Sequence, residues 1–317
     1  MVSIGSRLAP VAVFAFNRPN HTRACLTALA DSALAQESDL FVFIDGPRSE
    51  AVAVATREVH ELVAAMRDRF ANLTIIDREC NLGLAASIVD GVTRLVNDRG
   101  RVIAVEDDLI VAPLFLQYMN SFLDILADEP RVGSIHGYCY PGLLIKDPYY
   151  YVRGGDCWGW ATWKDRWDLF EPDGRRLLKA LIRDRHLFEF TLGFAAPYCR
   201  LLCAQILGKN NSWAIRWHAS LFLHNRLTLY PTTSLVQNIG LDGSGENCGD
   251  IRKYDTDIAT QEPTLPRDLP PLLPSIRARE HFVMIFSNGR RGLRRFIRRG
   301  LGMLSDLYWI LRVRFSQ

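Results

Sequence analysis

The first 130 residues alternate short apolar runs with longer amphipathic segments, and this alternation constrains the fold more than any other feature. The apolar runs are rich in β-branched and aromatic residues and predict strands at 10–16, 39–47, 73–83 and 101–108. The intervening amphipathic segments predict helices at 21–31, 49–70, 84–97 and 112–127. Strands that alternate with helices are typical of an α/β fold with a mostly parallel sheet flanked by helices.

Polar side chains follow the ends of these four apolar runs. They are Asn17 and Arg18, Asp45, Arg78 to Asn81, and Glu106 to Asp108. The carboxyl ends of parallel strands share one edge of a sheet, and ligands bind there. The sequence therefore predicts that these side chains gather along one rim and form a binding site.

The stretch RVIAVEDDLIVAPLF (101–115) ends an apolar strand in three adjacent carboxylates, Glu106, Asp107 and Asp108. Adjacent acids repel one another, and burying any of them without a partner is costly. Carboxylates are hard oxygen ligands, so a Mg²⁺ or Mn²⁺ ion that also holds phosphate oxygens would remove this repulsion. The alternative is that one acid caps the following helix while the others are solvated.

The segment VIAVEDDLIVAPLFLQYM resembles the strand, acidic motif and helix of N-acetylglucosaminyltransferase I and related bacterial family 2-like enzymes. These are nucleotide-sugar-dependent glycosyltransferases of the GT-A fold. The pieces FAFNRPNHTRACLTAL and FIDGP match in the same order along the chain. The resemblance covers residues 8–130 well and 131–250 loosely, and it does not reach the C-terminal tail. It implies a GT-A type mostly parallel sheet.

The resemblance also implies roles for the rim residues. Asp108 would be the direct ligand of Mn²⁺ or Mg²⁺, and Asp107 would lie near the ribose. Arg18 and Asp45 would contact the uracil or ribose end of a nucleoside diphosphate sugar. The remaining cofactor-binding positions that it implies are Asn81 and Glu106. Two structural alternatives stay open. Arg18 could do no more than pair with a surface acid, and Asp45 could do no more than build a turn.

The catalytic base is harder to place from the sequence. In the acetylglucosaminyltransferases that this chain resembles, the catalytic base is expected to be an Asp just before a Trp. Here that position holds Asn210 and Asn211. Asparagine cannot accept the proton of an attacking hydroxyl. We expect Asp156 to replace it, because Asp156 lies among glycines and tryptophans that suit a sugar site. The alternative is a tight turn with its tryptophans in the core, and Asp242 and Glu246 are further candidates.

The sequence predicts four regions. Residues 1–130 form the nucleotide-sugar-binding half of a GT-A domain, and 131–250 form the acceptor-binding half. A Pro-rich extended linker follows at 251–285, and a basic amphipathic helical tail at 286–317. Residues 281–317 hold eight arginines and one acid, a net +7, whereas the other 280 residues sum to −4. This tail is typical of a segment on an anionic membrane surface, and the alternative is a helix packed against the body with solvated arginines. The acidic body argues against nucleic-acid binding.

Cysteine usage and the N-terminus indicate the compartment. Seven cysteines are scattered without a CxxC pair, which fits a reducing cytosol. The stretch MVSIGSRLAPVAVFAF does not read as a signal peptide, and its apolar part is too short to span a bilayer. We therefore expect a cytoplasmic protein with peripheral contact at the inner membrane face.

Together these observations predict a metal-dependent glycosyltransferase of the hexosyl- or N-acetylhexosaminyltransferase type. It would move a sugar from a nucleoside diphosphate sugar, UDP-linked by resemblance, to a glycan or lipid-linked acceptor in polysaccharide biosynthesis. One alternative is a nucleotidyltransferase acting on sugar phosphates, although Asn17 to Asn20 stand where its Gly-rich loop belongs. Another is a non-catalytic glycan- or membrane-binding protein with the same fold. The sugar, the acceptor and the stereochemical outcome stay open.

Overall fold

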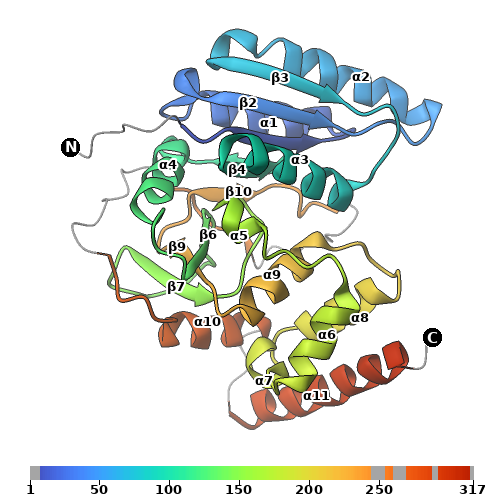
Figure 1. The fold of residues 1–317 in the computed structure, drawn as a ribbon, viewed down its shortest axis with the longest axis vertical. Coiled ribbons are helices and arrows are strands. Elements are labelled where there is room, and N and C mark those ends of the chain that lie inside the picture. The colour runs from blue at the N-terminus through green and yellow to red at the C-terminus, as the bar shows by residue number, and fades with distance from the viewer. Residues whose placement is uncertain (1–7, 244–253, 260–268, 288–291, 315–317) are drawn as a thin grey trace.

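A computed structural model of the chain describes residues 8–243, 254–259, 269–287 and 292–314 (Figure 1). Its main sheet has eight strands in the order β3-β2-β1-β4-β8-β6-β9-β7. They are β1 Val11–Ala15, β2 Asp39–Ile44, β3 Asn72–Asp77, β4 Arg101–Glu106, β6 Val132–His136, β7 Tyr149–Arg153, β8 Trp160–Trp163 and β9 Leu227–Pro231. A second, two-stranded sheet pairs β5 Leu109–Val111 with β10 Val236–Asn238.

The first four strands of the main sheet, β1 to β4, run parallel to one another. Strand β8 is antiparallel to both β4 and β6, so β4 and β6 run in the same direction. Strand β9 is parallel to β6, and the edge strand β7 is antiparallel to β9. The predicted α/β class, with a mostly parallel sheet flanked by helices, is therefore confirmed.

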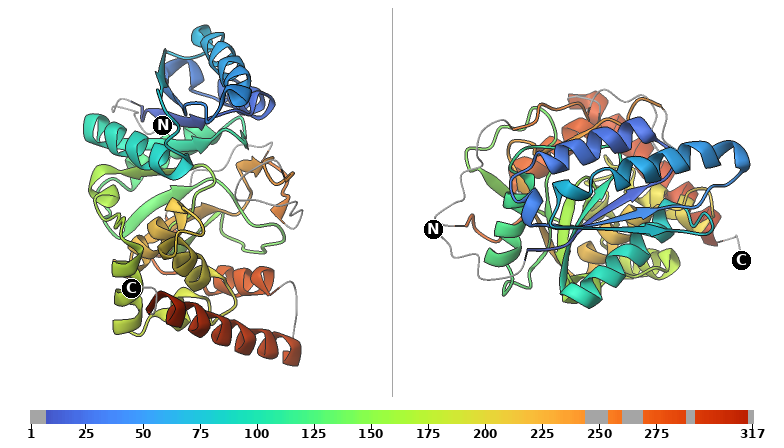
Figure 2. Two further views of the ribbon diagram at one scale, coloured as in Figure 1. Left: turned by 90° about the vertical axis from the view of Figure 1, so that its right-hand side faces the viewer. Right: turned by 90° about the horizontal axis from the view of Figure 1, so that it is seen from above.

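The first helices of the chain cover both faces of the sheet, and later helices form a separate layer. Figure 2 shows α1 and α2 on one face and α3 on the other. The α-helices are α1 Pro19–Ala30, α2 Glu50–Ala64, α3 Leu84–Arg99, α4 Phe115–Ile125, α5 Lys164–Trp167, α6 Gly174–Arg183, α7 Leu187–Phe190, α8 Tyr198–Ile206, α9 Trp213–Leu223, α10 Ile276–Phe286 and α11 Gly292–Arg314. Two 3-10 turns, η1 Ala35–Glu37 and η2 Arg67–Arg69, precede β2 and β3.

Burial on both faces explains why β1 reads as an unbroken apolar run. Val11 and Val13 belong to the core under α1 and α2, whereas Ala12 and Phe14 belong to the core under α3. Within the second core, the Trp160 indole packs against three other indoles. These partners are Trp167, Trp213 and Trp217. The stacked or tilted pairs among these four rings have centres 5.1–5.7 Å apart. Of the tryptophans near Asp156, Trp160 and Trp163 lie in the core, as the alternative expected, whereas Trp158 is half-buried.

Helix α11 lies against the body of the protein, beside α8 (Figures 1 and 2). Val313 is buried in a third core together with residues of α6 to α9. The Asp306 carboxylate is buried 3.5 Å from the Arg200 guanidinium of α8. The helical C-terminal segment predicted from the sequence is thus present, and one of its faces is docked.

The predicted extended linker at 251–285 is wrong in its last part, because residues 276–286 form α10. Ala278 and Phe282 of this helix are buried. The prolines just before the helix are typical of an extended segment, so the sequence did not predict the helix in spite of its apolar spacing. None of the helices in the described ranges combines the length and apolarity needed to cross a bilayer.

Candidate functional site

The acidic motif lies where β4 ends. Glu106 closes the strand opposite Phe14 of β1, and the chain then turns through Asp107 and Asp108 into β5. Asp107 and Asp108 are only 4% and 9% exposed. The Asp107 N–H donates to the Phe14 carbonyl at 3.1 Å, so the backbone of β1 fixes the turn. The carboxylates therefore sit at the predicted rim, out of bulk water.

Arg18 supplies the positive charge that the buried acids require. Its guanidinium donates to Asp107 and, at 2.9 Å, to Asp108 Oδ2. Thr22, one turn into α1, lies 3.5 Å from the second oxygen of Asp107. Burial raises the pKa of Asp107 to about 6, against the opposing effect of Arg18. Burial and the two aspartates also raise the pKa of Glu106 well above its usual range.

This pairing changes the role expected for Arg18. The sequence predicted that a metal ion offsets the repulsion between the acids, whereas here a side chain of the protein does so. A strand pattern places Arg18 at the rim but cannot give the direction of its side chain. Contact of Arg18 with the uracil or ribose stays a prediction. We call Arg18, Thr22, Asp107 and Asp108 the Arg18 cluster.

Two polar atoms of the Arg18 cluster are left without a partner among the described residues. They are Arg18 Nη1, a donor, and Asp108 Oδ1, an acceptor, and both are buried. Buried polar atoms in native proteins are rarely unpaired, and exceptions often mark a bound ion or ligand. In the described ranges no group of three or more His, Cys, Asp or Glu side chains could hold a metal. Mg²⁺ is often bound by only one or two carboxylates plus phosphate oxygens, so Asp108 Oδ1 fits such an ion.

The segment after β10 packs directly onto Asp108. The Ile239 N–H donates to the Asp108 carbonyl at 2.9 Å. A Cβ at Gly240 would lie 2.1 Å from Asp108 Oδ2, so no larger residue fits there. Asp242 reaches His21 of α1, with 3.3 Å between Oδ2 and Nε2. The described part of the segment that holds Asp242 therefore borders the Arg18 cluster. Glu246 lies outside the described residues.

Asp45 ties two rim loops together. It is 5% exposed and accepts hydrogen bonds from the N–H groups of Leu82 and Gly83, both at 2.8 Å. Asn81 donates to the Gly46 carbonyl at 2.9 Å. Both side chains lie at the predicted rim, and their contacts hold the entrance to α3. Their predicted contact with a nucleotide stays a prediction.

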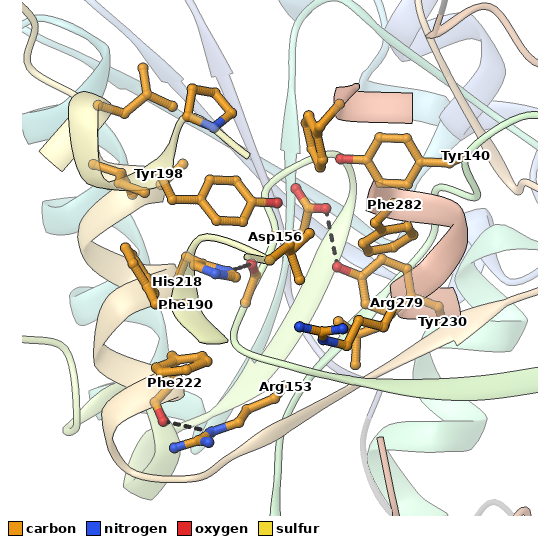
Figure 3. A pocket seen from close by; sticks show the side chains of 18 of the residues that line it. Tyr140, Arg153, Asp156, Phe190, Tyr198, His218, Phe222, Tyr230, Arg279 and Phe282 are labelled. Atoms are coloured by element: carbon orange, nitrogen blue, oxygen red, sulfur yellow. Dashed lines mark hydrogen bonds between the residues drawn. The ribbon is translucent and has the colours of Figure 1, made fainter. Parts of the chain in front are cut away.

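Asp156 lies in an aromatic cavity of about 290 Å³ (Figure 3). Its Oδ1 accepts the Cys157 N–H at 2.9 Å, and its Oδ2 accepts the Tyr230 hydroxyl at 3.1 Å. His136 is fully buried, with Nε2 3.7 Å from Oδ2 of Asp156. Burial lowers the pKa of His136, against the opposing effect of the Asp156 carboxylate. We call this space the Asp156 cavity.

The glycines before Asp156 are required by packing against α9. A Cβ at Gly154 would lie 2.5 Å from the His218 ring, and one at Gly155 would lie 2.8 Å from Trp217. Gly154 also adopts a φ of +98°, a conformation that other residues rarely reach. The strand and helix packing, rather than a flexible loop, thus fixes the backbone that presents Asp156.

The sheet topology brings the Asp156 cavity to the same edge as the Arg18 cluster. Trp160 at the start of β8 pairs with Ala104 near the end of β4. His136, the last residue of β6, also pairs with Trp160. Because β8 runs antiparallel, residues that precede it lie where β4 and β6 end. One edge therefore carries both a paired acid cluster and a carboxylate in an aromatic cavity.

Asn210, at the position expected for an acid, has a local structural role. Its side-chain oxygen accepts the Ser212 N–H at 3.0 Å, and its amide donates to the Leu201 carbonyl at 3.3 Å. Ser212 in turn caps α9 by accepting the Ile215 N–H. This position therefore shapes a helix start.

The sequence did not predict His136 and Tyr230 as site residues. A lone His or Tyr in an apolar run gives no signal beyond core packing.

Comparisons with known proteins give only remote likeness. No family model matches the chain, and no curated protein matches it. A crystal structure of TarS from S. aureus matches at TM-score 0.32 and 15% identity, covering 44% of this chain and 24% of that one. A crystal structure of the galactosyltransferase LgtC with donor and acceptor sugar analogues matches at TM-score 0.28 and 16% identity, covering 50% and 59%. This chain thus covers less than two thirds of either, and such likeness transfers no function.

Proposed function

We propose that this protein is a glycosyltransferase that uses a nucleoside diphosphate sugar, UDP-linked as the resemblance implies. The observation that carries the proposal is the pair of unsatisfied buried atoms in the Arg18 cluster, Arg18 Nη1 and Asp108 Oδ1. A diphosphate accompanied by a divalent cation satisfies both, because its oxygens accept from the guanidinium and its cation binds the carboxylate. A Mg²⁺ or Mn²⁺ ion held there by Asp108 would offset charge on the leaving diphosphate.

The Asp156 cavity would take the acceptor. An acceptor hydroxyl attacks the anomeric carbon of the donor, and the bond from that carbon to the diphosphate oxygen breaks. The Asp156 carboxylate receives the hydroxyl proton, which is the role of a general base. Tyr230 orients the carboxylate by donating to Oδ2, and the cavity walls keep water from competing with the acceptor.

The test is the release of UDP from a panel of UDP-sugars with and without Mn²⁺. We expect slow hydrolysis of at least one donor that requires the cation and disappears in Asp108→Asn. Binding of donors without any turnover, with or without candidate glycans, would contradict the proposal. That result would favour a non-catalytic glycan-binding protein, for which Asn210 at the expected base position is the supporting observation.

We also propose that α11 contacts an anionic membrane surface. Opposite its docked face, exposed apolar side chains recur every three or four residues. They are Ile297, Leu301, Leu304, Leu307, Tyr308 and Leu311. Arg312 and Arg314 are exposed at its end. Apolar side chains flanked by arginines suit the boundary between headgroups and acyl chains of anionic lipids.

Binding to vesicles of anionic lipid, compared with vesicles of neutral lipid, tests this contact. The double variant Leu301→Glu/Leu304→Glu should bind anionic vesicles at least about tenfold more weakly, because burying each leucine contributes about 1.5–3 kcal/mol. Val54→Glu is the matched control, since Val54 is 62% exposed on α2. Unchanged vesicle binding of the double variant would refute the proposal, whereas deletion of α11 would also disturb the core around Val313.

A further inference from the structure

The Asp156 cavity contains four charged side chains, and two of them satisfy each other. Arg153 pairs with Glu189 at 3.0 Å and donates to the Phe222 carbonyl at 3.1 Å. Its guanidinium also lies over the Phe222 ring, 4.0 Å from the ring centre. This arginine is therefore part of the cavity wall. The charges that remain for an occupant are Asp156 and Arg279.

Arg279 reaches into the cavity from α10 (Figure 3). The helix is held rigidly, because Phe282 and Ala278 are buried and Ser275 caps its first turn. His281 fixes the same helix to the segment between β6 and β7, because its Nε2 lies 3.0 Å from the Pro141 carbonyl. The Arg279 side chain is half-buried and has no hydrogen-bond or ion-pair partner within the described part of the chain. An ordered helix thus presents a spare guanidinium to an otherwise largely apolar space.

We propose that the Asp156 cavity binds a saccharide that carries an anionic group, and that Arg279 pairs with that group. This inference rests on the proposed function, because it names the acceptor class of the same site. The planar guanidinium matches a carboxylate or a phosphate with two parallel hydrogen bonds. The anion binds on the Arg279 side of the cavity, since Asp156 repels negative charge and needs a hydroxyl instead.

The aromatic walls fit the remaining parts of such a ligand. Tyr140, Tyr198 and Phe282 line the cavity around Asp156. Flat rings cover the C–H faces of a sugar, while the two charged groups fix its orientation. A neutral sugar would fill the same walls but would lack the charged hydrogen bonds to Arg279, so it would bind less tightly than an anionic one. The arrangement therefore selects for charge rather than for ring shape alone.

Calorimetric titration of the full-length protein, without donor, measures this selection directly. The probes are methyl glucoside, methyl glucuronide and glucose 1-phosphate, which separate a neutral ring, a carboxylate and a phosphate. We expect one anionic probe to bind at least about tenfold more tightly than the neutral glucoside, as a hydrogen bond to a charged group allows. The probe that binds more tightly identifies the source of the anion.

Arg279→Gln should remove this preference and leave affinity for the neutral glucoside within about twofold. Arg277→Gln is the matched control, because Arg277 is exposed on the same helix and does not line the cavity. Thermal unfolding of both variants verifies that they remain folded. Glucose 1-phosphate could also bind at the donor site. Binding that persists in Arg279→Gln and that UDP displaces belongs to that site, and it counts against recognition of phosphate in the Asp156 cavity.

Two results would overturn the inference. One is equal affinity of the wild-type protein for all three probes, or no binding of any. The other is a preference for anions that survives in Arg279→Gln. Neither depends on turnover, so failure here is distinct from failure of the proposed transferase activity. An anionic preference lost in Arg279→Gln, in a protein that never releases UDP, would uphold the cavity assignment and reject the catalytic one.

Discussion

Replacing Arg18 by glutamine tests whether the buried acids need a cation. In the wild-type protein one guanidinium pairs with both Asp107 and Asp108, whose side chains are only 6% and 13% exposed. Arg18→Gln keeps a neutral, shorter donor but removes the charge. Breaking a buried ion pair typically costs about 3–5 kcal/mol, because an uncompensated charge stays behind. The Arg18 side chain is 22% exposed, so we expect about 3 kcal/mol, at the low end.

The loss of stability should depend on pH with a definite sign. Burial raises the pKa of Asp107 to about 6 even with Arg18 present, and removing Arg18 raises that pKa further. The unfolded-state pKa is about 3.9, so the native variant binds more protons than the unfolded chain above about pH 4. Its stability therefore falls as pH rises. The deficit should be small at pH 5 and reach about 3 kcal/mol by pH 8.

Urea unfolding at pH 5 and pH 8, with and without Mn²⁺, measures both effects. If the cluster can hold a divalent cation, Mn²⁺ should restore about 2–3 kcal/mol to Arg18→Gln at a concentration near 100 times its dissociation constant. Arg69→Gln is the control, since Arg69 pairs with Asp31 at the exposed surface and should cost under about 1 kcal/mol. An equal deficit at both pH values, or one below 1 kcal/mol at pH 8, would refute the reasoning.

Two further variants test the other charged groups of the fold. Asp156→Asn should lower sugar transfer by about 10²–10⁴-fold and leave the dissociation constant of the donor unchanged in a calorimetric titration, because only proton transfer is lost. A normal transfer rate would exclude Asp156 as the base. Asp306→Asn should stabilise the protein by about 1–2 kcal/mol in urea unfolding at pH 7, because burial raises the pKa of Asp306 to about 6. This gain should vanish below pH 4, and a loss of stability at pH 7 would show that the pairing with Arg200 outweighs burial.

The sequence predicted the rim because apolar periodicity and strand ends are local signals. The four runs up to Glu106 became parallel strands, and Arg18, Asp45 and Asp108 all came to one edge. Local signals do not give the direction of a side chain. The pairing of Arg18 with the acids depends on how α1 packs beside β5, the strand that follows them, which involves residues about 90 positions apart.

The second half was less predictable because its contacts are mostly long-range. Strands β6, β7 and β8 lie in a region rich in glycine and aromatics, where no alternation of helices and strands marks them. Arg279 follows a Pro-rich stretch and was expected in an extended linker. His136 is a single polar residue at the end of a buried strand. For Asp156, the hydrogen-bond partner Tyr230 is 74 residues away.

Asp156 illustrates how strand direction, rather than composition, decides whether a residue belongs to the site. In an entirely parallel sheet, a residue that precedes a strand lies at the amino edge, opposite the acids. Asp156 precedes β8, and it reaches the acid edge only because β8 runs antiparallel between β4 and β6. His136 and Tyr230 reach that edge without a reversal, because they lie at the carboxyl ends of β6 and β9, which run in the same direction as β4. The antiparallel strand β8 therefore joins the two halves of the sheet into one candidate site. The site side chains on either side of β8 are the first to test by mutation.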